Sequence, residues 1–295
     1  MVSLRHPLTR ALGLAAGYIV SFWLVRLIYL TLVTYSFVRS PSNSALQKIG
    51  DVVRANQVLT YGFSALVFVT ILQVLQPLTR TQFKQVFNSV RLRESFAPNA
   101  LNGSILAAVL IVGSTLGGHM SYLGVYMKFD EVVFSLGSAA LFGAAMFITV
   151  VVEEYIMREV LEPELHRKLG LLGTLVGSSA IYLLVKWIQF DLDWTEAANL
   201  VLLNLTLSMI ARNEHSYMAS ASFCAAFLTL VHVLCGLPYM GQDMPGLLLL
   251  RAASDDGLGS LLSGGTTGPE SGIVLAVLLV IYLYLPQIRS KKIEV

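Results

Sequence analysis

The sequence predicts an all-α polytopic membrane protein, with about eight transmembrane helices in one bundle. Two observations predict this class. Apolar residues make up 55% of the 295 residues and charged residues only 13%. In addition, apolar stretches long enough to cross a bilayer recur along the whole chain. The net charge is only +2, and no basic patch interleaved with aromatic residues indicates a nucleic-acid partner. Membrane lipids are therefore the first expected partners.

The expected transmembrane helices follow one another from the N-terminus, most of them joined by short connections. They are Ala11–Val38, Leu59–Leu78, Leu101–Gly118, Val132–Val152, Leu169–Phe190, Ala197–Ile210, Tyr217–Leu237 and Ser271–Pro286. The first stretch is too long for the apolar region of a cleaved signal peptide, and no small-x-small site closes it. We therefore expect it to be a transmembrane helix.

Two connections are longer than the others. Thr79–Ala100 is basic and is expected to follow the cytoplasmic surface, as an amphipathic helix or as a plain loop. Tyr239–Glu270 is rich in glycine. Within this second connection, Met244–Leu262 has enough leucine to touch the bilayer surface. Ser263–Gly272 has the composition of a flexible linker.

Lysine and arginine residues predict the orientation of the chain. With the N-terminus in the cytoplasm, roughly thirteen of them fall on cytoplasmic segments and five on the opposite side. We therefore expect both termini in the cytoplasm. The chain then divides into four parts, which are N-terminal helices with a basic connection (1–100), a helical core (101–237), an extracytoplasmic loop (238–270), and a C-terminal helix with a basic tail (271–295).

A charged segment follows the expected span Val132–Val152 directly. It reads Glu-Glu-Tyr-Ile-Met-Arg and begins at Glu153. Carboxylates at the edge of a hydrocarbon layer are expensive. Glu154 and Arg158 are spaced to pair on the helix surface, while Glu153 points about 100° away from them. The segment is either a charged collar where a helix leaves the membrane or the site of an intramembrane catalytic carboxylate.

Several other intramembrane chemistries lack their residues in this chain. A zinc protease needs His-Glu-x-x-His on one helix, and no such run is present. The five histidines lack metal-ligand spacing, so neither a metal nor another cofactor is expected. Rhomboid-type and presenilin-type motifs are also missing. Cys224 and Cys235 lie about three helical turns apart, too far to form a disulfide with each other.

Two polar segments on later spans complete a set of three. Tyr182-Leu-Leu-Val-Lys186 lies on the fifth span and His232-Val-Leu-Cys-Gly236 on the seventh. Together with the Glu-Glu-x-x-x-Arg segment, they resemble the motifs of the CAAX protease and bacteriocin-processing (CPBP) family. Its archetype is the type II CAAX prenyl endopeptidase. The resemblance covers roughly residues 133–237.

The match to the family is complete only in the first motif. The family carries Phe-x-x-x-His as its second motif, where this chain has Tyr182 and Lys186. Its third motif is His-x-x-x-Asn, of which His232 is kept and the asparagine is replaced by Gly236. The resemblance implies a bundle that encloses an intramembrane cavity.

Residue spacing supports the same alignment. Gly170 is expected to be the turn of a helical hairpin, because glycine often ends helices. Glu153 and Lys186 are each about 16–17 residues from it, or about 25 Å along a helix. His232 lies about 18 residues beyond the next expected turn, near Glu214. We therefore predict that Glu153, Lys186 and His232 face one cavity, with side-chain ends within about 4–8 Å.

The resemblance implies a hydrolytic mechanism, and the departures from the motifs weaken it. In the family, the first glutamate and the second-motif histidine activate a water, while the third motif holds the oxyanion. Lys186 would instead hold Glu153 in an ion pair, and Gly236 offers no side-chain donor. The candidate catalytic residues are Glu153, Glu154, Lys186 and His232. Arg158, Tyr182 and Gly236 are expected to support the site, and the Glu154–Arg158 pair is expected to be structural as well. Asn199 and Asn204 are expected to bridge helices through hydrogen bonds.

Two classes of function remain open. One is a catalytically impaired relative, a pseudoprotease that binds a partner helix, lipid or other ligand as a subunit of a membrane complex. The other is an active intramembrane endopeptidase that cleaves lipidated or membrane-tethered peptide tails. Lys186 and Gly236 favour the first class. A structural subunit without a cavity ligand is the least specific alternative.

Overall fold

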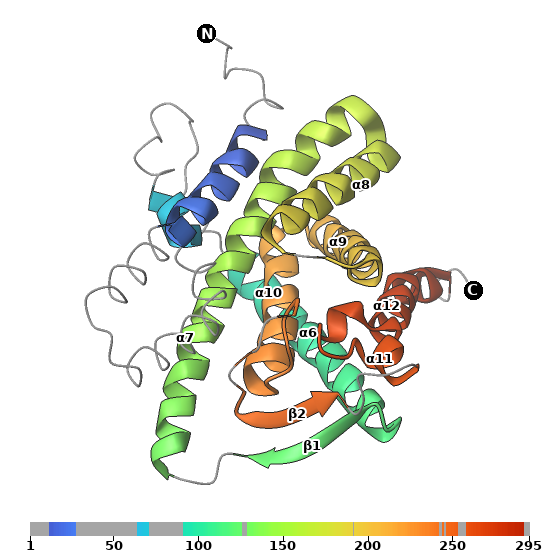
Figure 1. The fold of residues 1–295 in the computed structure, drawn as a ribbon. Helices are drawn as coiled ribbons and strands as arrows, with labels where there is room; N and C mark the ends of the chain where they lie inside the picture. Colours follow the sequence, from blue (N-terminus) through green and yellow to red (C-terminus); the bar gives the residue numbers. More distant parts are fainter. Residues whose placement is uncertain are drawn as a thin grey trace.

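The computed structural model describes residues 12–27, 64–70, 91–125, 129–190, 192–241, 244, 246–252 and 258–291. These residues are mostly helical (Figure 1). The described part of each expected span contains helix. For the first two spans the described parts are Leu12–Leu27 and residues 64–70. The rest of those spans, and residues 79–90 of the basic connection, lie outside the described residues.

The labelled helices follow the order of the expected spans. They are α6 (Arg91–Leu116), α7 (Phe129–Glu154), η1 (Tyr155–Leu161), α8 (Glu162–Gln189), α9 (Trp194–Asn213), α10 (Tyr217–Leu228), η2 (Thr229–Leu234), α11 (Leu258–Ser263), η3 (Pro269–Ser271) and α12 (Ile273–Lys291). Residues 91–100 of the basic connection form the beginning of α6 and thus continue into the third span without a break.

Within the part of the chain that the structure describes, three helical stretches are long and apolar enough to cross a membrane. They are Ser95–Leu116, Ala139–Gln189 and Tyr217–Leu234. Leu12–Leu27 and Ile273–Tyr284 are apolar but shorter. The molecule is therefore helical and carries membrane-length apolar helices. The number of eight spans stays a prediction, as does the orientation of the termini.

A long hairpin positions the motif residues. Helix α7 runs without a break through η1 into the first part of α8, and the chain then turns back on itself (Figure 1). The turn is Gly170, whose φ of 68° lies in the left-handed region. The predicted hairpin turn is confirmed. At 1.5 Å per residue, the arm from residue 129 to 169 is about 60 Å long, about twice the thickness of a bilayer's hydrocarbon core.

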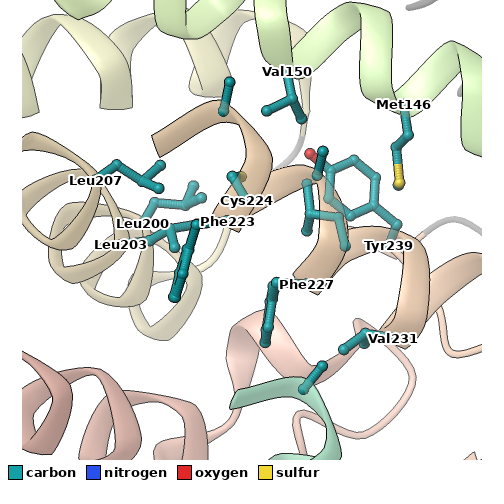
Figure 2. Close-up of a cluster of buried hydrophobic side chains, with 14 of the residues drawn as sticks. Met146, Val150, Leu200, Leu203, Leu207, Phe223, Cys224, Phe227, Val231 and Tyr239 are labelled. Atoms are coloured by element: carbon teal, nitrogen blue, oxygen red, sulfur yellow. The ribbon is translucent and has the colours of Figure 1, made fainter. Parts of the chain in front are cut away.

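Helix α10 lies at the centre of the core and packs against α6, α7 and α9. Figure 2 shows part of this core, with Leu200, Leu203 and Leu207 of α9 beside Phe223 of α10, and with Met146 of α7 beside Tyr239. Gly103 of α6 sits against the backbone of Phe223, where an added Cβ would lie 2.1 Å from the carbonyl oxygen. A small residue is required for two helices to approach so closely.

The structure adds a small β-sheet to the predicted helical fold. Strands β1 (Met120–Val125) and β2 (Leu248–Ala252) pair as a two-stranded antiparallel sheet. Part of the leucine-rich stretch expected at the bilayer surface therefore forms β2. Glycine and proline interrupt the stretch and disfavour one long helix, and the backbone groups of β2 are satisfied by pairing with β1.

The prediction of a flexible linker at Ser263–Gly272 is wrong. This segment is a packed turn in which Ser263 and Glu270 are each only 3% exposed. Asn199 of α9 donates its side-chain amide to the carbonyls of Glu270 and Gly272, at 2.6 and 2.9 Å. The glycines give the backbone the positive φ angles of a tight turn rather than freedom to move.

Candidate functional site

Glu153 and Lys186 form a buried ion pair. Glu153 is the second-last residue of α7, and Lys186 comes from the returning part of α8, so the Gly170 hairpin brings them together. The Lys186 Nζ lies 2.8 Å from both carboxylate oxygens of Glu153. The two residues are 8% and 2% exposed. The predicted contact between these residues is confirmed.

The sequence analysis missed a third member of this group, Tyr18 of the N-terminal helix. Its hydroxyl donates to Oε1 of Glu153 at 3.3 Å. Aromatic rings complete the surroundings of Lys186, with the ring centres of Tyr182 and Phe190 at 5.6 and 5.9 Å from Nζ. Tyr182 is thus part of the wall around the ion pair and favours the cation through its ring.

A small cavity borders the carboxylate. It measures about 20 Å³, counted as the space open to the centre of a water molecule. Its lining is formed by Ala15, Tyr18, Glu153, Ile156, Met157, Tyr182 and Val185. A cavity of this size holds about one water molecule. In this conformation a peptide chain does not fit beside Glu153.

Arg158 lies at the centre of a second buried network, one helical turn from Glu153. Its Nε donates to Glu154 Oε2 at 3.0 Å, and its Nη1 contacts Glu162. Its two terminal nitrogens also donate to Ser208 Oγ and Asn204 Oδ1, each at 2.8 Å. The predicted Glu154–Arg158 pair is confirmed. Its predicted surface position is wrong, because the two residues are only 2% and 6% exposed.

Asn204 links this network to the returning helix. Its amide nitrogen donates to Ser179 Oγ of α8 at 3.0 Å, while its oxygen accepts from Arg158. The predicted role of Asn204 as a bridge between helices is confirmed. Asn199 makes the corresponding bridge to the Ser263–Gly272 turn, as described above.

Arg158 and His232 both lie in π-helical segments, η1 and η2. A π turn inserts one extra residue into a helix and changes the direction of the side chains that follow. Such turns are frequent at functional sites. Both departures from regular helix therefore fall on the segments that the sequence motifs single out.

His232 is fully buried, and both of its ring nitrogens have partners. Nδ1 lies 3.0 Å from the carbonyl oxygen of Leu237, and Nε2 lies 2.5 Å from Oε1 of Glu270. A carbonyl oxygen only accepts, so Nδ1 must carry a proton. The ring is therefore held from both sides, by the Leu237 carbonyl and by the Glu270 side chain.

The structure divides the predicted three-residue site. Among the described residues, the hydrogen bonds of His232 go to Leu237 and Glu270 and none goes to the Glu153–Lys186 pair. A chain of aromatic contacts connects the two places. The Tyr239 ring is 5.0 Å from the imidazole and 5.6 Å from the Phe190 ring, which lies near Lys186.

The backbone conformation explains why a glycine, Gly236, stands at the third-motif position. Its φ is +66°, and its N–H bonds to the carbonyl of His232 as the helix ends. An added Cβ would lie 2.9 Å from Cα of Gly246, because two backbone segments cross there. An asparagine does not fit at this position without moving the segment before β2.

The sequence analysis missed two partners, Glu162 and Glu270, and residue spacing could have identified only Glu162. Glu162 follows Arg158 by four residues, the same spacing that predicted the Glu154 contact. Glu270 lies 38 residues from His232 in a glycine-rich stretch, and no helical periodicity connects them. Its role depends on the fold of the Ser263–Gly272 turn.

Among the described residues, no group of three or more His, Cys, Asp or Glu side chains has the arrangement of a metal site. Comparisons of the chain with protein families, curated proteins and solved structures found no match. The functional assignment therefore rests on the motif positions and on the geometry described above.

Proposed function

We propose that this protein is a non-proteolytic membrane relative of the glutamate-dependent CPBP endopeptidases, a pseudoprotease that serves as a binding or assembly subunit. The observation that carries the proposal is the contact of Lys186 Nζ with both oxygens of Glu153, at 2.8 Å each. The residues that would activate water in a protease instead bond to each other.

The state of the Glu153 carboxylate supports this proposal. Lys186 donates to both of its oxygens and Tyr18 donates to one of them. A general base must instead accept a proton from a bound water. The oxygens that a catalytic water would need are therefore already engaged.

The third-motif position supports the same conclusion. An oxyanion donor must aim a free N–H at the reacting centre, and removal of one such donor typically lowers the rate by about 10²–10³. Both ring nitrogens of His232 are engaged, and Gly236 has no side chain. Neither residue offers a donor to a tetrahedral intermediate in this conformation.

The N-terminal helix covers the carboxylate and supports a binding role. Tyr18 and Leu14 are buried against the start of η1, whereas Val20, Trp23 and Leu24 on the same helix are 45–65% exposed. We propose that this outer face meets lipid or a transmembrane helix of another subunit. The proposed ligand thus contacts the covering helix rather than entering the small cavity.

The second candidate is an active endopeptidase in which Glu153 activates a water. The space for one water beside the carboxylate favours it. An assay in proteoliposomes separates the two functions. Wild type, Glu153→Gln and Lys186→His are incubated with lipidated and membrane-tethered peptides, and the products are identified by mass spectrometry. Glu164→Gln, which changes a carboxylate on the Arg167 surface pair, is the matched control.

We expect no cleavage by the wild type or by the control. Cleavage by the wild type that disappears in Glu153→Gln would overturn the pseudoprotease proposal. Cleavage gained only in Lys186→His would support it, because the lysine would then be the residue that silences the site.

We also propose that both termini face the cytoplasm and that the loop before α12 faces the other side. The positive-inside bias of the sequence supports this orientation. Single cysteines at Ser290 and at the exposed Thr266, in a background without the two native cysteines, should be labelled from opposite sides of the membrane. Labelling of both cysteines from one side would contradict the proposed topology. It would not test the Glu153–Lys186 ion pair.

A further inference from the structure

A second cavity lies between α6, α9 and α12, away from the motif residues. Its volume is about 220 Å³, again counted as the space open to the centre of a water molecule. Its polar lining consists of Asn99, Asn102, Thr206, Asn213, Glu214 and Tyr282. None of these residues belongs to the Glu153–Lys186 pair, to the Arg158 network or to the His232–Glu270 pair.

The polar lining combines amide and hydroxyl groups, which both donate and accept, with one carboxylate, which only accepts. Glu214 is the single charged side chain among the described lining residues. Asn99 donates its amide nitrogen to the Ser95 carbonyl at 2.8 Å, which leaves its amide oxygen for the cavity. Thr206 likewise donates its hydroxyl proton to the Leu202 carbonyl at 2.8 Å, so the lone pairs of its oxygen are left to accept.

The end of α9 adds to the negative character of the cavity. Glu214 is the C-cap of that helix, and Asn213 is its last residue. The C-terminus of a helix carries partial negative charge and favours a cation in its last turn. A carboxylate, a helix C-terminus and amide oxygens together form a site for a group with several N–H donors and a positive charge.

The helices around the cavity favour a lipid as the source of this group. Leu101 and Ile105 of α6 are 61% and 52% exposed, and Ile281 and Tyr284 of α12 are 50% and 58% exposed. Such apolar stripes meet acyl chains in a membrane. We infer that this cavity binds a primary ammonium group, and that the group is the headgroup of an ethanolamine phospholipid whose chains follow α6 and α12.

Native mass spectrometry tests the inference on the full-length protein. The protein is equilibrated in micelles with equal amounts of phosphatidylethanolamine, phosphatidylcholine and phosphatidylglycerol that have the same acyl chains. We expect the wild type to retain phosphatidylethanolamine about tenfold over phosphatidylcholine, because a quaternary ammonium lacks the N–H donors of a charge-assisted hydrogen bond. Phosphatidylglycerol, an anion, should be retained least.

Glu214→Gln should remove most of this preference, and Glu164→Gln should keep it. Glu214 is exposed, so its variant should fold and should melt like the wild type in phosphatidylcholine alone. Soluble glycerophosphoethanolamine is added in a separate arm. If it displaces the lipid only at a large excess, the lipid is the source; displacement at equal concentration would identify a soluble amine.

Besides displacement by the soluble amine at equal concentration, two results would overturn the inference. One is equal retention of phosphatidylglycerol and phosphatidylethanolamine by the wild type. The other is an unchanged preference in Glu214→Gln. Neither result bears on the proteolysis assay. The lipid site is therefore tested independently of the proposed function.

Discussion

Two adjacent glutamates at the end of α7 have different surroundings. Glu154 belongs to a network in which the guanidinium of Arg158 is bonded on every side, by two carboxylates, a serine and an asparagine. Glu153 is bonded to one lysine and one tyrosine, with a small cavity beside it. The first arrangement leaves no room for a ligand. The second keeps a charged group beside an open space.

This difference separates a structural role from a site that can change. Burial of ions is expensive, and a buried pair offsets that expense only when its remaining donors and acceptors are satisfied. The Arg158 network meets this condition and holds η1, α8 and α9 together. The Glu153–Lys186 pair joins only α7 and α8 and borders the small cavity, so a substitution there changes the surroundings of the carboxylate directly.

The largest expected effect is on the Arg158 network. Arg158→Met leaves Glu154 buried without its ion-pair partner, while Glu162 keeps only its contacts with Ser208 and Arg212, so the protein should be destabilised by about 5 kcal/mol. Thermal denaturation in detergent micelles measures this loss of stability. Arg167→Met, at an exposed position, is the control and should lose less than about 1 kcal/mol. Arg158→Lys should fall between them, because lysine lacks the planar fork. If Arg158→Met melted like the control, the network would not be structural.

Lys186→Ala tests the simpler pair. We expect a loss of about 3–5 kcal/mol, because Glu153 would remain buried and unpaired. The double variant Glu153→Gln/Lys186→Met should lose less, since it removes both charges. The same melting assay compares them. Equal stability of the wild type and Lys186→Ala would show that the pair does not form in solution.

The His232–Glu270 pair extends the comparison to a third buried site. Glu270→Gln should destabilise the protein by about 1.5–3 kcal/mol, the usual contribution of a hydrogen bond to a charged group. The Ser263–Gly272 turn should also become more sensitive to limited proteolysis, because the pair holds it on η2. Glu164→Gln serves as the control. Unchanged proteolysis of the turn would contradict the anchoring role.

The smallest expected effect concerns the third-motif glycine. Gly236→Ala and Gly241→Ala both place a side chain at positive φ, but an added Cβ meets the backbone of Gly246 only at 236, with open space at 241. Gly236→Ala should therefore be less stable than Gly241→Ala by about 1–3 kcal/mol, the usual effect of overpacking. Similar melting of the two would show that the crossing relaxes easily.

Contacts within the long hairpin could be predicted from the sequence, because helical spacing determines them. The Gly170 turn sets Glu153 opposite Lys186, and four-residue spacing sets Glu154 beside Arg158. The same spacing would also have identified Glu162, which was not predicted. These predictions needed only the rise and period of a helix.

Contacts that depend on irregular segments could not be predicted in this way. Glu270 and the strand pairing involve segments whose composition resembles that of loops, and their positions follow from the rest of the fold. The burial of Arg158 escaped prediction for a related reason. Helical spacing shows which residues are neighbours on one helix, but not that α9 brings Ser208 and Asn204 over them.

The pairing of β1 with β2 has a consequence for how the chain is made. Ser121 and Arg251 face each other across the sheet although they are 130 residues apart. At a synthesis rate of about 5–20 residues per second, β1 leaves the ribosome on the order of ten seconds before its partner exists. During that interval β1 has an open edge that any other extended segment can occupy. The sheet is therefore a late step of biogenesis, and truncation before residue 248 leaves that edge permanently unpaired.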